Sequence, residues 1–350
     1  MRIITRVMGA RLTIVCGLLS TALSRTAAEM SGYHLAKKIS IGGEGLWDYV
    51  KVDPEGRRVY VSHATQVEVL DADSGDLVGT IPDLKGVHGI EVVPELQKGF
   101  ITEGLAAAVT VFDLKTLKKL GSISAGKKAD GLTYEPVSRR IFVFNGVGES
   151  ATVIDAASGS VVKTIPLGGA PEFPVADGKG HVFVNLEDKN TLLCLNSEKL
   201  TIEKRWPVAP CDEPASMAMD RKHNRLFIGC GNERMAVAES ESGRIITTLP
   251  VGPHVDATAF DPGTSLVFNS TYNGAISVFR EDAPDKFSSA GTIKTQQGSK
   301  TMGLDIKSHK VFVPAGTFDP PLLENAIKTP PSSKLAARTF SVLIFDRAKP

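Results

Sequence analysis

Carboxylate and imidazole side chains recur along this chain of 350 residues at intervals of about 42 residues. They stand twelve residues before a regularly spaced series of aromatics, at a position occupied in turn by Asp48, His88, Asp130, Pro171, Ala215, Asp256 and Lys300. Carboxylate oxygens are ligands for Ca²⁺, Mg²⁺ or Mn²⁺, and an imidazole shifts the preference toward a transition metal. If these positions meet in space, they predict a site for a divalent cation or another polar ligand.

Other polar residues lie next to this position in the sequence, or in the loops that are expected to join the second and third strands of each repeat. The candidate site as a whole comprises Asp48, His63, His88, Asp130, Glu172, Glu213, His254 and Asp256. The candidate metal ligands are Asp48, His88, Asp130 and Asp256, and a divalent cation is the candidate cofactor. Asp and His at the start of a strand also bond backbone N–H groups and fix loops, so a structural role is the alternative.

The aromatics that define the interval belong to short apolar segments such as VYV at 59–61 and IFVF at 141–144. They are Tyr60, Phe100, Phe142, Phe183, Phe227, Phe268 and Phe312. Each copy contains four short β-branched segments separated by turns rich in Asp, Pro, Gly and Ser. Four strands per repeat and seven repeats predict an all-β, seven-bladed β-propeller with four-stranded antiparallel blades.

The two ends of the chain are expected to complete one blade. The seventh copy has a third strand at 341–345 and no fourth. The segment 35–41, which is followed by two glycines, resembles the fourth strand at 161–167. We therefore expect the N-terminal strand to close the last blade, which removes an open sheet edge. Residues 29–350 are then a single propeller domain.

The first 28 residues have the features of a Sec-type signal peptide. Arg2, Arg6 and Arg11 precede an apolar run at 12–23, and small residues follow at 26–28. The run is shorter than the roughly 20 residues of a membrane span. We therefore expect export to the periplasm or the extracellular space, and no membrane span. Without residues 1–28 the formal net charge changes from +1 to −3, which disfavours nucleic acid as a partner.

Four cysteines are too few for a disulfide scaffold, and no CxxC, CxxCH or HExxH string occurs. Cys211 lies in the loop before the fifth copy, and Cys230 follows the second strand of that copy. Both fall on the same face of the expected ring, so we predict a Cys211–Cys230 disulfide in an oxidising compartment. Cys194 lies in an apolar string, where an inert core thiol is expected.

The seventh copy departs from the pattern by about twenty extra residues at 316–338, which contain four prolines. Their position places them on the same face as the polar side chains. A lid or a partner-docking loop is the functional interpretation, and a passive insertion is the alternative.

The VYV and VFV strands, and the D-x-x-(S/T)-G turn that leads into V-x-T-I-P, make the repeat resemble the YVTN-type propellers. The chain is similar more specifically to exported bacterial YncE-like proteins, in strings such as GGEGLWDY at 42–49, PEFPVADG at 171–178 and DATAFDPG at 256–263. This resemblance covers essentially the whole chain after residue 28 and implies the propeller fold. It implies little about function, because members linked to binding and to redox partners share the scaffold.

Two functions fit these features. The first is an exported binding or scaffold protein, expected as a monomer, that presents an acid-rich channel rim to a small polar ligand or a partner protein. The alternative is a metal-dependent propeller enzyme, a lyase or a lactonase-type hydrolase, with His88 or His254 as general base. No known catalytic string supports the enzyme, so we favour binding. Single-stranded DNA binding is weakened by the negative charge and the sparse aromatics.

Overall fold

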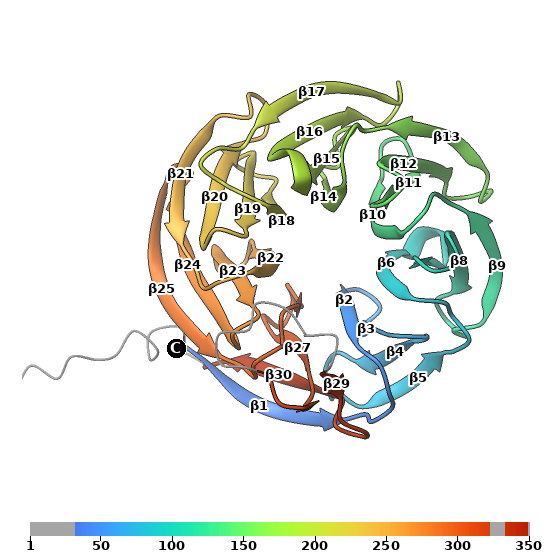
Figure 1. Cartoon of the computed structure of the whole chain (residues 1–350), viewed down its shortest axis with the longest axis vertical. Coiled ribbons are helices and arrows are strands. Elements are labelled where there is room, and N and C mark those ends of the chain that lie inside the picture. The colour runs from blue at the N-terminus through green and yellow to red at the C-terminus, as the bar shows by residue number, and fades with distance from the viewer. Residues whose placement is uncertain (1–31, 323–332, 349–350) are drawn as a thin grey trace, which may run out of the picture.

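The computed structural model describes residues 32–322 and 333–348, which form a ring of seven four-stranded antiparallel sheets around a central channel (Figure 1). Each sheet is one blade, and in the first six blades the chain runs from the innermost strand to the outermost. The seven-bladed β-propeller predicted from the repeats is confirmed. The predicted signal peptide at residues 1–28 lies outside the described residues.

The first four blades follow one another along the chain. Blade one contains β2 (Trp47–Asp53), β3 (Arg58–His63), β4 (Gln66–Asp71) and β5 (Leu77–Ile81). Blade two contains β6 (Val87–Val93), β7 (Lys98–Glu103), β8 (Ala108–Asp113) and β9 (Lys119–Ser124). Blade three contains β10 (Ala129–Glu135), β11 (Arg140–Asn145), β12 (Ser150–Asp155) and β13 (Val161–Pro166). Blade four contains β14 (Pro171–Ala176), β15 (His181–Leu186), β16 (Thr191–Asn196) and β17 (Thr201–Pro207).

The remaining blades include the one that closes the ring. Blade five contains β18 (Pro214–Asp220), β19 (Arg225–Cys230), β20 (Arg234–Glu239) and β21 (Ile245–Pro250). Blade six contains β22 (Val255–Asp261), β23 (Leu266–Thr271), β24 (Ala275–Ala283) and β25 (Lys286–Lys294). Blade seven contains β26 (Gly303–Leu304), β27 (Val311–Ala315), β30 (Ser341–Arg347) and β1 (Tyr33–Ser40). Two 3-10 helices, η2 (Pro94–Leu96) and η3 (Glu187–Lys189), lie in connecting segments.

Short polar residues in the turns explain where the strands end. After β4, the carboxylate of Asp71 accepts hydrogen bonds from the backbone N–H groups of Asp73 and Ser74. Gly75 follows with a φ of 77°, a left-handed conformation that glycine adopts at little cost. This geometry explains why the D-x-x-S-G string precedes an outermost strand.

The hydrophobic core lies between neighbouring blades. The repeat aromatics are buried on the second strands, and Phe142 of blade three is one of those that are fully buried. Phe142 belongs to a cluster that includes Val182 and Leu195 of blade four. The outermost strands, such as β9, are mostly exposed. Each blade therefore depends on both neighbours for the burial of its apolar faces.

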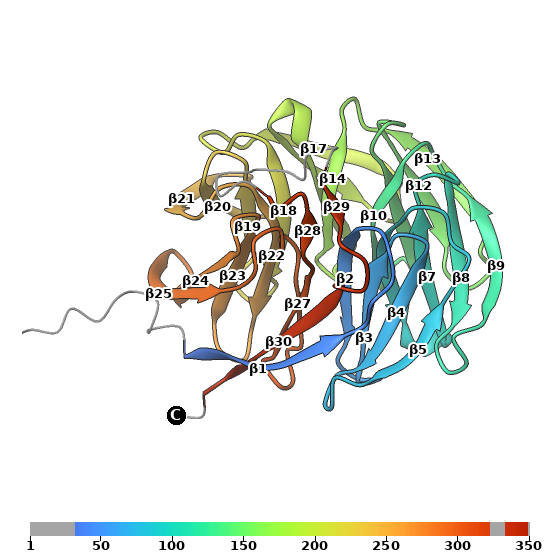
Figure 2. The ribbon, with the colours of Figure 1, turned by 60° about the horizontal axis from the view of Figure 1, so that its bottom comes forward.

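The N-terminal strand closes blade seven, as the sequence predicts. β1 is antiparallel to β30, with Tyr33 opposite Arg347 and Ser40 opposite Ser341. The two strands lie side by side in both views of the ribbon (Figure 1 and Figure 2). Tyr33 also packs edge-on against Phe268 of blade six, with ring centroids 5.4 Å apart. No helix in the described ranges is long and apolar enough to cross a membrane.

The 316–338 segment begins and ends as a small hairpin. β28 (Phe318–Asp319) pairs with β29 (Lys334–Leu335), while residues 323–332 lie outside the described residues. Phe318 is buried against Trp47, with ring centroids 6.1 Å apart. The described base of this segment is therefore packed onto the junction of blades seven and one.

Candidate functional site

The first residue of each regular inner strand pairs with the last residue of the second strand, as Trp47 does with His63 and Val87 with Glu103. The second residue of each inner strand therefore occupies an equivalent position at one end of the channel. With Lys300, which precedes the short inner strand of blade seven, these residues form what we call the polar ring. Its members are Asp48, His88, Asp130, Glu172, Ala215, Asp256 and Lys300.

In blade four the structure corrects the position expected from the sequence. Pro171 pairs with Leu186, so Pro171 is the first residue of its strand and Glu172 is the second. The segment between these paired residues is one residue shorter than in blade one, where Trp47 pairs with His63. Blade four therefore contributes a carboxylate to the polar ring.

Three ring residues from adjacent blades are in contact. His88 Nδ1 lies 2.6 Å from Asp48 Oδ2 and 3.6 Å from Asp130 Oδ1. One ligand atom from each of the three residues lies within 4.8 Å of the other two. Asp130 is buried, whereas Asp48 and His88 are partly exposed. This cluster has the donor atoms to bind a cation, and its hydrogen bond also holds blades one and two together.

Charges within this cluster determine its protonation. Burial opposes a charge on His88, but the hydrogen bond to Asp48 and the carboxylate of Asp130 outweigh it and raise the pKa of His88. Burial also opposes the charge on Asp48, yet the hydrogen bond from His88 and the charge of Lys300 lower the pKa of Asp48. Burial and the charge of Asp48 raise the pKa of Asp130. The arrangement favours a protonated His88 that donates to an ionised Asp48.

Two ammonium groups reach the ring. Lys128 Nζ lies 3.1 Å from Asp130 Oδ2, and Lys300 Nζ lies 3.1 Å from Asp256 Oδ1. The charge of Asp256 raises the pKa of Lys300, so this lysine stays charged. Burial raises the pKa of Asp256 although Lys300 opposes that shift.

Glu172 is the least compensated carboxylate of the polar ring. It makes no hydrogen bond or ion pair with any other residue that the structure describes. Burial, together with the charges of Asp130 and Glu187, raises the pKa of Glu172 well above its ordinary value, although the charge of Lys128 opposes this shift. A cation placed beside this side chain would favour its ionised form.

A cavity of about 330 Å³ borders the ring on the side of blades five to seven. Its lining includes Glu187, Glu213, His254, Asp256 and Lys300. Three of the side chains singled out in the sequence, Glu213, His254 and Asp256, therefore share one cavity. Burial and the charge of Glu213 raise the pKa of Glu187.

An aromatic pair crosses the channel beneath the ring. Tyr49 and Phe173 stack with ring centroids 5.1 Å apart. They follow the ring residues of blades one and four, whose inner strands face each other across the channel (Figure 1). A second cavity, of about 580 Å³, is lined by both aromatics and by residues further along the inner strands. We call this pair the aromatic floor, because it separates the ring from the second cavity.

His63 lies outside the polar ring. It is 1% exposed and pairs with Trp47, the first residue of the inner strand. Its ring stacks on Phe340 with centroids 3.9 Å apart, and Nδ1 lies 3.2 Å from Glu68 Oε1. The structure therefore gives His63 a place in the packing between blades one and seven.

Sequence reasoning did not single out Lys128, Tyr49 or Phe173 as site residues. Each lies within two positions of a ring carboxylate, which is the one signal that could have identified them. A lysine or aromatic near a strand start is common, so the signal becomes informative only once the ring is assembled.

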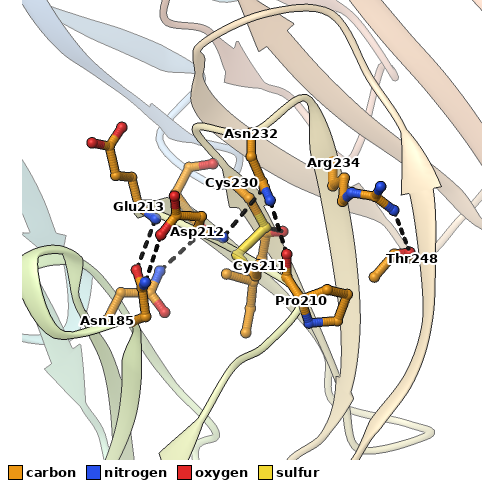
Figure 3. The surroundings of a disulfide bond; sticks show 12 residues. Asn185, Pro210, Cys211, Asp212, Glu213, Cys230, Asn232, Arg234 and Thr248 are labelled. Carbon is orange, nitrogen blue, oxygen red and sulfur yellow. Dashed lines mark hydrogen bonds between the residues drawn. A yellow bond between two sulfur atoms is a disulfide. The ribbon is translucent and has the colours of Figure 1, made fainter.

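A disulfide fixes the loop that carries Glu213. Cys211 and Cys230 have an S–S distance of 2.02 Å (Figure 3). Asn232 accepts a hydrogen bond from the backbone N–H of Asp212 and donates one to the carbonyl of Pro210. These contacts hold the loop between blades four and five beside the cavity of about 330 Å³ that Glu213 lines. Cys194 is buried and free.

We expect a Cys211→Ala/Cys230→Ala double variant to lose roughly 3 kcal/mol of unfolding free energy, the value typical for a closed loop of this size. The two cysteines are 19 residues apart. Urea denaturation of the oxidised protein and the variant measures this difference. Dithiothreitol should destabilise the wild type, because it reduces the Cys211–Cys230 disulfide. It should leave the stability of the double variant unchanged, because that disulfide is absent and Cys194 is a free thiol. Equal midpoints for the oxidised wild type and the variant would contradict the prediction.

Comparison of the sequence with protein-family models finds no match, and comparison with curated proteins finds none. The fold alone therefore defines the class: the protein is a seven-bladed β-propeller.

Proposed function

We propose that the protein is a binding protein that takes a small, positively charged ligand at the polar ring. Acidic side chains outnumber basic ones there. The carboxylates of the ring and its adjoining cavity are Asp48, Asp130, Glu172, Glu187, Glu213 and Asp256, whereas the ammonium groups are Lys128 and Lys300. A cationic ligand would relieve the repulsion among these carboxylates, and an anion would add to it.

The observation that carries this proposal is the carboxylate of Glu172, which makes no hydrogen bond or ion pair with another described residue. A positively charged ligand, either a metal dication or an organic ammonium, would replace the proton that burial favours on this side chain. The aromatic floor limits how far such a ligand enters, so recognition takes place at one end of the channel. This geometry supports a shallow polar site more than a passage through the ring.

The direct test is calorimetric titration of the full chain with two probes, Mn²⁺ and 1,4-diaminobutane. We expect one of them to bind with a Kd below about 1 mM. Glu172→Gln should weaken that binding by about tenfold or more, since a charged hydrogen bond contributes roughly 1.5–3 kcal/mol. Glu198→Gln is the matched control, because Glu198 is exposed in the turn between β16 and β17 at the other end of blade four. Its affinity should equal that of the wild type.

Two results would overturn the proposal. One is the absence of binding by either probe to the wild type. The other is equal affinity of Glu172→Gln and the wild type for the probe that binds. Retention of the wild-type melting temperature by Glu172→Gln would show that any loss of affinity is not caused by misfolding.

A second candidate function, a metal-dependent lyase or lactonase, is favoured by the Asp48–His88–Asp130 cluster. Its donor atoms are close enough to bind one cation. However, the raised pKa of His88 disfavours the neutral form that a ligand or a general base needs. Lactone hydrolysis that requires Mn²⁺ and is lost in His88→Gln would favour the enzyme over the binding protein.

The cellular setting and family are part of the same proposal. The Cys211–Cys230 disulfide and the arginine-led apolar N-terminus support export to an oxidising compartment. The repeat strings support membership of the exported YncE-like propellers. Within that setting the 316–338 segment, whose described base packs against Trp47 of blade one, is the proposed contact for a partner protein.

A further inference from the structure

A second cluster of ligand-type side chains lies between blades five and six, away from the polar ring. Asp220 is the last residue of β18, at the opposite end of that strand from the ring position. His223 follows in the turn to β19, and Glu281 comes from β24 of blade six. Asp220 Oδ2 lies 2.6 Å from His223 Nδ1, and Glu281 Oε1 lies 3.2 Å from the same nitrogen. All three ligand atoms lie within 4.8 Å of one another.

The hydrogen bonds of this cluster leave one buried oxygen without a donor. His223 Nδ1 has hydrogen-bond geometry toward Glu281 Oε1. Asp220 Oδ2 is close to the same nitrogen, but it is buried and has no hydrogen-bond partner among the described residues. Asp220 as a whole is 3% exposed. A buried carboxylate oxygen that accepts no hydrogen bond is costly unless a cation or a proton compensates it.

Charge compensation from the surrounding protein is also missing. Neither carboxylate forms an ion pair with a lysine or an arginine among the described residues. Arg221, next to Asp220, donates to the carbonyl of Ala176, and Arg280, next to Glu281, donates to the carbonyl of Thr264. Arg225 pairs with Asp285 and Glu239. One imidazole therefore faces two buried acidic groups, which repel each other unless a cation or a shared proton lies between them.

The equivalent position in blade six shows what a purely structural pair looks like. Asp261, the last residue of β22, lies 2.7 Å from Nδ1 of His309. Its other contacts include the hydroxyl of Thr264 and the backbone N–H of Gly263. This pair has no third ligand within the same distance limit in the described part of the chain. Two features therefore distinguish the Asp220–His223–Glu281 cluster. They are the added carboxylate of Glu281 and the Asp220 oxygen that accepts no hydrogen bond.

We propose that Asp220, His223 and Glu281 bind a divalent transition-metal cation that links blades five and six. Two carboxylate oxygens and one imidazole nitrogen suit Zn²⁺, Co²⁺ or Mn²⁺ better than Ca²⁺ or Mg²⁺, which prefer oxygen ligands alone. The His223 side chain is 30% exposed, so a cation can enter from solvent and a water molecule can complete its coordination. This site is independent of the function proposed for the polar ring.

The test uses Zn²⁺ on the full chain after treatment with a chelator. Because the polar ring could bind the same ion, all titrations are made in a background protein that carries both His88→Gln and Glu172→Gln. We expect one equivalent of Zn²⁺ to bind and to raise the melting temperature. Asp220→Asn and Glu281→Gln should each lower the affinity by more than about tenfold, because loss of a residue that only hydrogen-bonds a metal ligand already costs about 10–100-fold. Asp261→Asn is the matched control and should bind Zn²⁺ like the background protein.

Co²⁺ provides a second readout, because its visible absorption changes when imidazole and carboxylate ligands replace water. His223→Ala should abolish that change, and this variant is least prone to misfold because His223 is in a partly exposed turn. The proposal is wrong if the background protein binds no Zn²⁺, or if Asp220→Asn and Glu281→Gln bind it as tightly as the background protein. The first result would assign the cluster to a shared proton between the two carboxyl groups.

Discussion

A chain that begins at Gly42, and so lacks β1, should not form a stable monomeric ring. Without β1, β30 becomes the open edge of blade seven, and the backbone groups of β30 that face β1 lose their partners while those that face β27 keep theirs. Each lost backbone hydrogen bond costs about 1 kcal/mol, so the total is a large part of the 5–15 kcal/mol that stabilises a typical domain. Loss of the Tyr33 contact with Phe268 adds to it. An open edge also pairs readily with other chains.

Size-exclusion chromatography with light scattering and thermal melting measure this effect. The matched control is a chain that begins at Gly32, which keeps β1 and should melt as a cooperative monomer. A synthetic peptide of residues 32–41 should restore part of the lost stability to the shorter chain. A chain from Gly42 that stays monomeric, with the melting temperature of the control, would show that β1 is not needed for closure.

The second large effect is expected at the core between blades three and four. Phe142→Ala should lower the unfolding free energy by about 3–5 kcal/mol, because it leaves a cavity at a fully buried ring. Urea denaturation monitored by circular dichroism measures the shift. Phe142→Leu preserves more of the volume and should cost less. Val161→Ala, on the exposed outermost strand of the same blade, should stay within about 0.5 kcal/mol of the wild type. A loss below about 1 kcal/mol in Phe142→Ala would contradict this account.

The propeller could be predicted because its determinants are local and repeated. The aromatic of each second strand, such as Phe142, recurs at a nearly constant interval, and each turn has its own Asp and Gly signals, as in Asp71 and Gly75. Closure could be predicted from the missing fourth strand of the last copy. These features need no knowledge of side-chain contacts.

The site could be predicted only in part. Asp48, His88 and Asp130 meet because each is the second residue of an inner strand. His63 does not join them, because it pairs with Trp47 and its side chain packs between blades. Glu172 takes the ring position instead of Pro171 because a shorter connection shifts the register by one residue, and a fixed count along the sequence cannot detect this.

The cluster of Asp220, His223 and Glu281 could not be predicted from the sequence, for a different reason. Asp220 and His223 are close in sequence, but Glu281 comes from the third strand of the next blade. Its approach depends on the length of β24, which continues to Ala283. Contacts between strands of different blades depend on strand length and blade packing, and the repeat pattern does not specify either quantity.

The pairing of β1 with β30 also has a consequence for the order of folding. The contact between Tyr33 and Arg347 joins the two ends of the described chain, so it can form only after nearly all of the polypeptide is available. Contacts between residues so distant in sequence carry a high loop-closure entropy and are associated with slow folding. During synthesis, the early blades therefore remain in an incomplete ring until β30 is available. Of the described strands, β1 is the first to be synthesised and one of the last to pair.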